Sequence, residues 1–251
     1  MRRGLSLIEI LVAIAIVGVL IAILVPVLAG ARSVAKDTRR LAWAGQLGQA
    51  TNAYTNDFDG LYPYLGTPRS STGPITYRED VLSTKPFRHR YFWMNAIRDS
   101  HLSVDAREVP GVITDPPENG IFGNVPDDVL VSGWTLSNTT CAVVAFWRPG
   151  ASIDEGQLVP MGAHQLVFPS GKVILSRAVD GIASGIYAIA PDEELEDPDA
   201  ARQLVLGDGS ARVYDRDEVT GNFVEDRPTQ WGALALPMEA TVDGIAGIDI
   251  P

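Results

Sequence analysis

The 251-residue chain contains very little cysteine. Cys141 is its single cysteine, so no disulfide can form within the chain, even in an oxidising compartment. Hydrophobic residues make up 46% of the sequence, which is ordinary for a globular protein and enough for a real core. We therefore expect packing to stabilise the fold, with a bound metal ion as the one supplement to consider.

The sequence also lacks the short motifs that carry common enzymatic chemistry. It has no GxSxG elbow, no P-loop and no dinucleotide-binding glycine motif. The three histidines, His89, His101 and His164, lie far apart, with no HExxH pattern and no pair at metal-ligand spacing. Cys141 lies in an apolar strand pattern without an identifiable base, which favours a core side chain over a nucleophile. We expect no enzymatic activity and no required cofactor.

Basic residues are scarce beyond the N-terminal part of the chain. Residues 60–251 carry 14 Lys and Arg against 27 Asp and Glu, which gives a net charge of −13. Unaided binding to nucleic acid requires clustered Lys and Arg that displace counterions. We therefore expect no nucleic-acid partner.

Acidic residues are densest between positions 192 and 199. Ca²⁺ prefers several oxygen ligands in a flexible loop, so this segment is the candidate calcium site of the sequence. The EF-hand spacing is absent, and the pattern favours the alternative of a solvated acidic loop. The acids are Asp192, Glu193, Glu194, Glu196, Asp197 and Asp199.

A long apolar run stands near the N-terminus, directly after Glu9. From Ile10 to Ala31, 22 consecutive residues are uncharged. As a helix they would rise about 33 Å, which is enough to span a bilayer. A carboxylate in a membrane helix costs on the order of 3 kcal/mol unless it is paired. The run is therefore a cleaved secretory signal, a plain signal anchor, or a segment that uses Glu9.

Two features resemble a secretory signal: the basic start at Arg2 and Arg3, and the small residues 29–31 (Ala-Gly-Ala). The apolar run is nevertheless longer than the usual core of about 7 to 15 residues. A passive signal also has no reason to keep an acid such as Glu9. Both points favour a segment in which the carboxylate has a role.

The stretch from Gly4 to Glu9 (GLSLIE), after a short basic leader and before an apolar helix, resembles the N-terminal motif of type IV pilins and type II secretion pseudopilins. The resemblance implies that a prepilin peptidase on the cytoplasmic side cleaves between Gly4 and Leu5. It also implies that the new terminal amine of Leu5 is methylated and that Glu9 becomes the fifth residue of the mature chain. Phenylalanine is the usual residue where this sequence has Leu5.

The resemblance further assigns roles within the helix. Glu9 would pair with the terminal amine of a neighbouring subunit, which relieves both charges in the apolar layer. Gly18 and Pro26 match a glycine and a proline that the family commonly has there, in a stretch that could loosen when the helix leaves lipid. A simple kink in an anchor is the alternative for both residues.

The resemblance implies a single-pass protein of the inner membrane, with its N-terminus in the cytoplasm and its globular domain outside, which later enters a filament. A count of positive charges alone gives the opposite orientation, because four basic residues follow the span. We follow the resemblance, because the peptidase must reach Gly4. Its partners would be other pilin or pseudopilin subunits, the prepilin peptidase, the inner-membrane assembly platform and the membrane itself. The four basic residues are Arg32, Lys36, Arg39 and Arg40.

The chain is expected to divide into a leader (1–4), a membrane and assembly half of the helix (5–31), an amphipathic continuation (32–59) and an acidic, β-rich globular domain (60–251). Asp59 and Gly60 predict the end of the helix, since Gly60 suits a left-handed cap. One face of the continuation is apolar at helical spacing and should pack on the domain. That face consists of Trp43, Leu47, Ala50, Tyr54 and Phe58.

The domain is expected to begin with loops in residues 61–128, including a short helix near residues 90–99. Residues 139–147 (TTCAVVAFW) read as a central strand. Residues 165–173 and 203–213 each read as strand, turn and strand, with Asp208 and Gly209 the stronger hairpin signal. The repeated VDGIA at 179–183 and 242–246 reads as recurrent hairpin chemistry. These patterns predict an α+β fold, with the long helix packed on an antiparallel sheet.

The stretch from Gln46 to Pro63 also looks like the region after the anchor in a subgroup of large bacterial pseudopilin-like proteins. Domains of that subgroup often have a histidine spaced before an Asp-Gly turn. Here Pro198 stands ten places before Asp208, so membership of the subgroup is less secure than membership of the superfamily.

We therefore expect a structural subunit, minor or specialised, of a type II secretion pseudopilus or a type IV pilus-like filament. One alternative is a membrane-anchored module that binds cargo or a ligand, in which Trp134, Trp147 and Trp231 contribute to an exposed patch. A second is a secreted enzyme behind an ordinary signal peptide.

Overall fold

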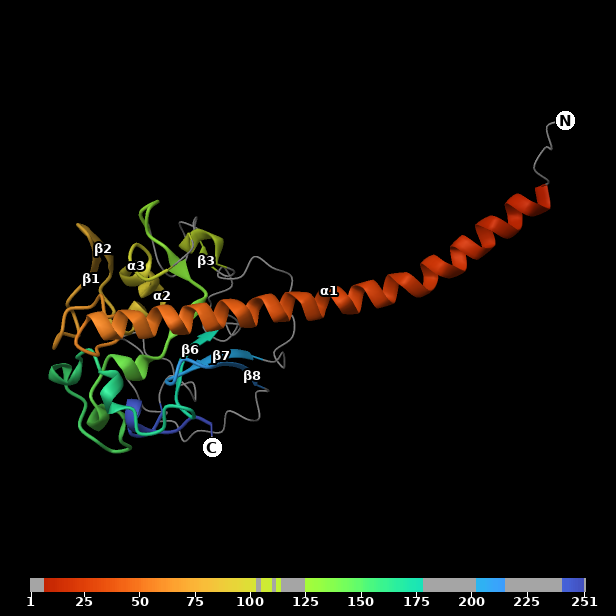
Figure 1. Cartoon of the computed structure of the whole chain (residues 1–251). Coiled ribbons are helices and arrows are strands. Elements are labelled where there is room, and N and C mark those ends of the chain that lie inside the picture. Colours follow the sequence, from red (N-terminus) through yellow and green to blue (C-terminus); the bar gives the residue numbers. More distant parts are fainter. Residues whose placement is uncertain are drawn as a thin grey trace. The chain divides into compact units, whose positions relative to one another are not determined.

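The computed structural model describes residues 7–102, 105–109, 112–113, 125–177, 202–214 and 241–250, with the backbone alone for Glu9, Ala29 and Ser33. The chain divides into two compact units, residues 1–40 and residues 41–251. Helix α1 (Leu7–Asp57) begins in the first unit and ends in the second (Figure 1). The α+β prediction is confirmed: a long apolar helix near the N-terminus is accompanied by antiparallel sheets in the C-terminal part.

The part of α1 that belongs to the second unit is amphipathic. Ala44, Leu47 and Ala50 are buried, and Tyr54 packs partly buried beside them. Most of the predicted apolar face is therefore correct. Phe58 is the exception, because it is 48% exposed and stacks on Tyr54 with 4.1 Å between ring centroids.

Helix α1 ends where the Asp-Gly pair predicts. Asp59 and Gly60 both have positive φ, at 52° and 77°. Asp and Gly tolerate this left-handed conformation better than other residues do. The turn lets the N–H of Gly60 donate to the carbonyl of Thr55 at 2.7 Å, so a carbonyl at the end of the helix is satisfied.

A four-stranded antiparallel sheet forms the centre of the second unit, in the order β5, β6, β7, β8. Its strands are β5 (Trp134–Leu136), β6 (Val173–Arg177), β7 (Arg202–Leu206) and β8 (Ala211–Tyr214). The hairpin predicted at residues 203–213 is confirmed as β7–β8. Its turn has Gly209 at φ 82°, and the N–H of Ser210 donates to the carboxylate of Asp208.

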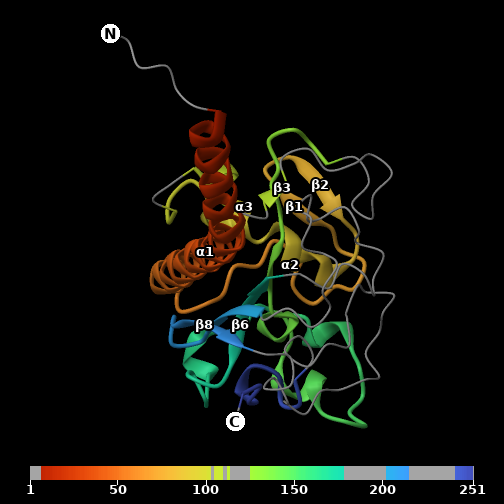
Figure 2. The ribbon, with the colours of Figure 1, turned by 90° about the vertical axis from the view of Figure 1, so that its right-hand side faces the viewer.

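Two further strand pairs lie in the same unit. Strand β1 (Ile75–Tyr77) pairs with β2 (Asp80–Ser83), and β3 (Val112–Ile113) pairs with β4 (Val131–Ser132), both antiparallel. Figure 2 shows β1, β2 and β3 together in the upper part of the unit, and β6 and β8 below them. Residues 61–128 were expected to be mostly loops with one short helix. They also contain the strands β1, β2 and β3.

The helix expected near residues 90–99 is present as three short segments. They are η1 (Pro86–Arg88), α2 (His89–Phe92) and α3 (Met94–Ile97), followed later by the 3-10 turn η2 (Ala106–Glu108). The Asn95 amide donates to the carbonyl of Leu130 and accepts from its N–H, at 2.8 and 2.9 Å. This pair of bonds satisfies buried backbone groups of Leu130 that belong to no sheet.

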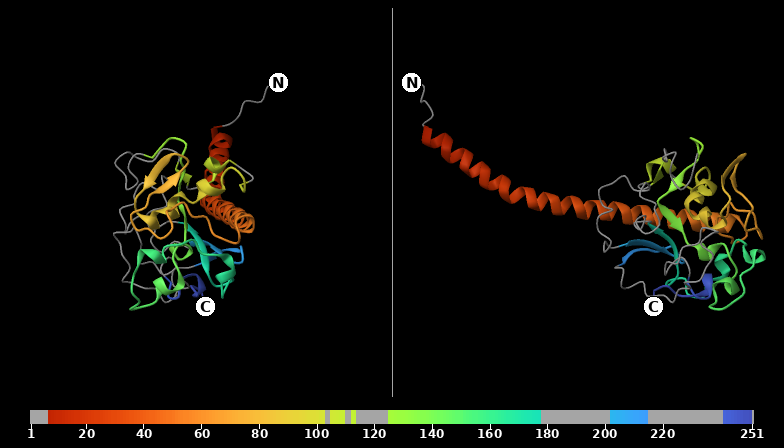
Figure 3. Two further views of the ribbon diagram at one scale, coloured as in Figure 1. Left: turned by 90° about the vertical axis from the view of Figure 1, so that its left-hand side faces the viewer. Right: turned by 180° about the vertical axis from the view of Figure 1, so that it is seen from behind.

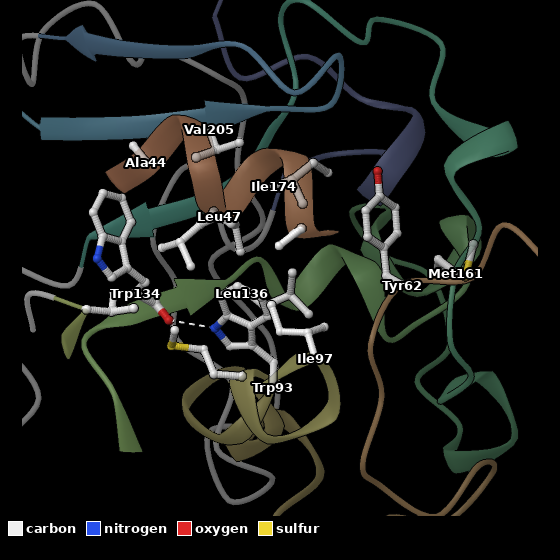
Figure 4. Packing of buried hydrophobic residues seen from close by; sticks show 14 of the residues in the cluster. Ala44, Leu47, Tyr62, Trp93, Ile97, Trp134, Leu136, Met161, Ile174 and Val205 are labelled. Carbon is white, nitrogen blue, oxygen red and sulfur yellow. Dashed lines mark hydrogen bonds between the residues drawn. The ribbon is translucent and has the colours of Figure 1, made fainter. Parts of the chain in front are cut away.

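The core joins these elements to α1. Leu47 and Ala44 pack in one cluster with Val205 of β7, Ile174 of β6 and Trp134 of β5 (Figure 4). The indole N–H of Trp93 donates to the carbonyl of Trp134 at 2.7 Å, so a large side chain is buried without an unpaired polar atom. The prediction that the helix packs on the sheet is confirmed within the second unit.

The predicted central strand at residues 139–147 is wrong. The segment forms two 3-10 turns, η3 (Asn138–Thr140) and η4 (Val144–Trp147), with Cys141 between them. Side chains of Ser137 and Thr140 bond to neighbouring backbone groups, which offers the chain an alternative to a sheet ladder. Cys141 is buried, as predicted for a core side chain, and its thiol donates to the carbonyl of Asn138.

The hairpin predicted at residues 165–173 is also wrong. Its first half contains the 3-10 turn η6 (Ala163–Gln165), and only Val173 belongs to a strand. Another turn, η5 (Glu155–Gln157), precedes it. Strand β6 instead pairs with β5 and β7, which are distant in the sequence, so local turn signals did not determine its partners.

The C-terminal copy of VDGIA forms a turn rather than a hairpin. Asp243 and Gly244 have positive φ, and η10 (Gly244–Ala246) follows. This turn contacts η3 and η4, as the dark blue and green segments of Figure 3 show. The other copy, at residues 179–183, lies outside the described residues.

At Gly48, α1 comes very close to the β7–β8 hairpin. A Cβ added there would lie 2.7 Å from Val205 Cγ1 and 2.9 Å from the carbonyl oxygen of Gly209. A Cβ added to Gly45, three residues earlier in the same helix, would meet nothing within 4 Å. Gly45 is therefore a suitable control position for a substitution at Gly48.

We expect Gly48→Ala to lower the free energy of unfolding by about 1–2 kcal/mol, because the clash outweighs the better helix propensity of alanine. Gly45→Ala should raise it by up to about 1 kcal/mol. Urea unfolding of the full-length chain in detergent measures both. Equal effects of the two substitutions would contradict the close approach.

Candidate functional site

The N-terminal part of α1 presents an apolar surface on all sides. Every side chain described between Leu7 and Arg39 is exposed. Large apolar side chains recur at nearly every position, from Leu7 (81% exposed) to Leu28 (45% exposed). A helix that is apolar all round requires a membrane or other chains to cover it. By length and composition this helix can cross a membrane.

The apolar surface ends at a short charged stretch. Arg32, Lys36, Arg39 and Arg40 follow the run, and Arg40 forms an ion pair with Asp37 at 3.1 Å. The hydroxyl of Thr38 donates to the carbonyl of Val34, so this hydroxyl has its hydrogen-bond partner within the helix. Basic residues at this position are typical of the end of a membrane span.

The residues predicted for processing and assembly are placed as follows. Gly4 and Leu5 lie outside the described residues, and Glu9 lies in the first turns of α1 without a described side chain. Gly18 and Pro26 both lie inside α1, which continues through them. A Cβ on Gly18 would meet nothing within 4 Å. Nothing described in this chain therefore requires a glycine there, and a requirement must come from a partner.

The comparisons agree with this geometry. A family model described as the prokaryotic N-terminal methylation motif matches residues 1–25. The chain carries the prepilin motif of type IV pilins and pseudopilins. Neither the curated proteins nor the solved structures gave a match. The match covers the prepilin motif and the start of the apolar surface.

The prepilin motif is the part of the site that the sequence predicted correctly. The tryptophan patch is wrong, because Trp134 and Trp147 are both fully buried. Trp231 lies outside the described residues. The indoles of Trp134 and Trp147 therefore belong to the core and contribute to no exposed ligand surface.

No metal site is found in the described part of the chain, where no group of three or more His, Cys, Asp or Glu could hold an ion. The acidic segment at residues 192–199 lies outside that part. Calcium binding there therefore stays a prediction.

Sequence analysis missed a row of hydrogen-bonded groups at the end of α1. His101 Nε2 lies 3.0 Å from Asp57 Oδ2, and its Nδ1 lies 2.6 Å from Ser100 Oγ. Asp57 and Ser100 are exposed, so water competes with this row. The imidazole ring also packs on Tyr54 and Phe58. The row ties the end of α1 to the segment after α3. No sequence pattern could indicate it, because Asp57 is 44 residues from His101.

His89 lies in a different environment. Its ring is fully buried with its edge against Tyr64, and neither nitrogen has a hydrogen-bond partner among the described residues. Burial, together with the neighbouring charge of Arg90, lowers the pKa of His89 to about 3. The side chain is therefore neutral in the folded protein at all physiological pH values.

This pKa predicts acid destabilisation. Below pH 6.5 the unfolded chain binds a proton on His89 that the folded chain does not, so stability falls as the pH decreases from 6.5 toward 3. The loss should be about 2 kcal/mol between pH 6.5 and 4.5. Urea unfolding across this range measures it.

In the His89→Phe variant that part of the pH dependence should disappear, because phenylalanine has no titratable group. An identical pH profile for wild type and His89→Phe would show that His89 is not the responsible group.

Proposed function

We propose that the chain is a structural subunit of a type II secretion pseudopilus or a type IV pilus-like filament. One observation carries the proposal: the prepilin motif leads into a helix whose described side chains between Leu7 and Leu28 are exposed and apolar on every side. A membrane covers such a surface before assembly, and the helices of other subunits cover it afterwards.

Cleavage between Gly4 and Leu5 gives Glu9 a function. The new amine of Leu5 lies four residues before Glu9 in the sequence. Both charges then stand in an apolar layer, where each is costly without a partner. A carboxylate and an amine on neighbouring subunits satisfy each other, and the pair fixes the register between helices more than it adds net stability.

Gly18 and Pro26 fit the same proposal. Pro26 has no N–H to donate, so the helix lacks one hydrogen bond at that turn. Membrane helices tolerate such a position because polar groups of neighbours can satisfy the carbonyl that remains. We take this stretch as the place where the helix loosens on transfer from lipid to filament.

The remaining parts of the proposal concern topology and partners. The N-terminus stays in the cytoplasm for the prepilin peptidase, and the domain of residues 60–251 lies outside. The inner-membrane assembly platform then extracts the subunit. The domain is larger than that of a usual major subunit, which supports a minor or specialised position.

Two alternatives remain distinct from this proposal. A cargo-binding module on the same anchor loses its main support, because Trp134 and Trp147 are buried. A secreted enzyme behind a signal peptide would be cleaved near residues 29–31, yet α1 is continuous through that stretch. A protease needs an extended backbone, so the helix disfavours this second alternative.

The N-terminus of the mature protein tests processing. We expect N-terminal sequencing and mass spectrometry of the membrane-extracted protein to find a methylated Leu5. Gly4→Val should keep the leader attached, because a side chain then occupies the cleavage position. A mature chain that begins near Arg32 would refute the proposal in favour of a secreted protein.

Glu9→Ala tests the assembly role separately. The substitution removes a costly charge, so membrane insertion should persist or improve, whereas incorporation into filaments should fall sharply. Ser6→Ala in the same segment is the control and should assemble normally. Fractionation and crosslinking to neighbouring subunits provide the readout, and normal incorporation of Glu9→Ala would contradict the role of the carboxylate.

A further inference from the structure

Lys172 and Asp249 form a fully buried pair outside the prepilin motif. Lys172 stands directly before β6, and Asp249 belongs to the C-terminal segment. Lys172 Nζ lies 3.0 Å from Asp249 Oδ2, and both side chains are 0% exposed. A primary amine and a carboxyl group are therefore held in contact where water does not reach.

Thr241 bridges the two groups. Lys172 Nζ donates to Thr241 Oγ1 at 2.6 Å, and this hydroxyl donates in turn to Asp249 Oδ1. The other carboxyl oxygen, Oδ2, accepts the backbone N–H of Val173 at 2.8 Å. The hydroxyl therefore connects the amine to one carboxyl oxygen, and a fixed backbone donor points at the other.

The backbone holds this arrangement in place. The N–H groups of Asp249 and Ile250 both donate to the carbonyl of Gly171, at 2.9 and 3.0 Å. A Cβ on Gly171 would lie 2.7 Å from the carbonyl oxygen of Ile250, so the two segments approach as closely as glycine allows. The amine and the carboxyl group are thus prepositioned by contacts that do not involve either side chain.

Burial favours the neutral form of both side chains. Desolvation lowers the pKa of Lys172 and raises the pKa of Asp249, in each case against their mutual attraction. The direction for both is toward a neutral amine and a neutral acid, which are the nucleophilic and electrophilic forms.

We infer that Lys172 and Asp249 condense into an intramolecular isopeptide bond. A proton of the ammonium group first passes through Thr241 to Oδ1, which leaves a neutral amine beside a carboxylic acid. Nζ then attacks Cγ, and the π electrons of the carbonyl move onto Oδ2, which the N–H of Val173 stabilises. A second proton passes from Nζ to Oδ1, and Oδ1 leaves as water. The product is an amide that keeps one proton on nitrogen, and no oxidant or other reactant is consumed.

Such a bond would compensate for the lack of disulfides. It would close the chain covalently from Lys172 to Asp249, a stretch that contains β6, β7 and β8. Crosslinks over long loops restrict the unfolded chain strongly. In the folded chain, the bond would keep the C-terminal segment attached to β6.

Mass spectrometry of the purified full-length chain tests the bond directly. We expect the measured intact mass to be one water (about 18 Da) lower than the mass calculated from the sequence that starts at the observed N-terminus. Peptide mapping should find a peptide containing Lys172 joined to one containing Asp249. A measured mass equal to the calculated mass, together with tryptic cleavage between Lys172 and Val173, would overturn the inference. The two residues would then form an ordinary ion pair.

Variants separate the bond from a merely structural pair. Lys172→Met and Asp249→Ala should each restore the calculated mass, and Lys85→Met should keep the loss of one water. Thr241→Val keeps the shape of the side chain but removes the relay, so the fraction of bonded chain should fall at least tenfold. Full bond formation in Thr241→Val would refute the relay, and persistence of the mass loss in Lys172→Met would refute the assignment. All masses are read on denatured protein, so a variant that folds poorly still gives an answer.

Discussion

Helix α1 is apolar on every side over its first part and apolar on one side over its last part. The first condition requires cover from outside the chain, and the second provides the surface on which the globular unit is built. Ala44, Leu47 and Ala50 place small and medium side chains against the sheet, so helix and strands share a single core. A change in that face would therefore alter the domain and its attachment at the same time.

The globular unit forms its core without disulfides by burying aromatic groups, and the indole N–H groups of Trp93 and Trp147 are hydrogen-bonded there. Trp93 donates to Trp134, and Asn95 satisfies both backbone groups of Leu130. Phe87, Phe146 and Trp147 form a second aromatic cluster around Cys141. Many of these residues lie in short turns rather than long strands. Specific side-chain contacts therefore take over part of the role that backbone ladders have in a larger sheet.

Local signals predicted some of these features well and others badly. The prepilin motif, the stop at Asp59 and Gly60, and the β7–β8 hairpin each depend on a few adjacent residues, and all three are recognisable in the sequence. The segment at residues 139–147 misled the prediction, because a short buried apolar run has the same composition in a strand and in packed 3-10 turns.

Specific polar contacts between distant residues could not be predicted. The row of Ser100, His101 and Asp57 depends on how the end of α1 meets the segment after α3. Lys172 and Asp249 meet because the C-terminal segment bonds to Gly171, the chain neighbour of Lys172, and neither residue stands in a recognisable motif. A single sequence carries no information on such pairings until the strand order is known.

The close approach at Gly48 has a mechanical meaning. With Val205 and the carbonyl of Gly209 against the helix backbone, no layer of flexible side chains separates α1 from the hairpin at that point. A layer of flexible side chains between helix and hairpin would deform before it transmitted a force from one to the other. A load applied along this part of the helix would therefore reach β7 and β8 through direct contact with the helix backbone.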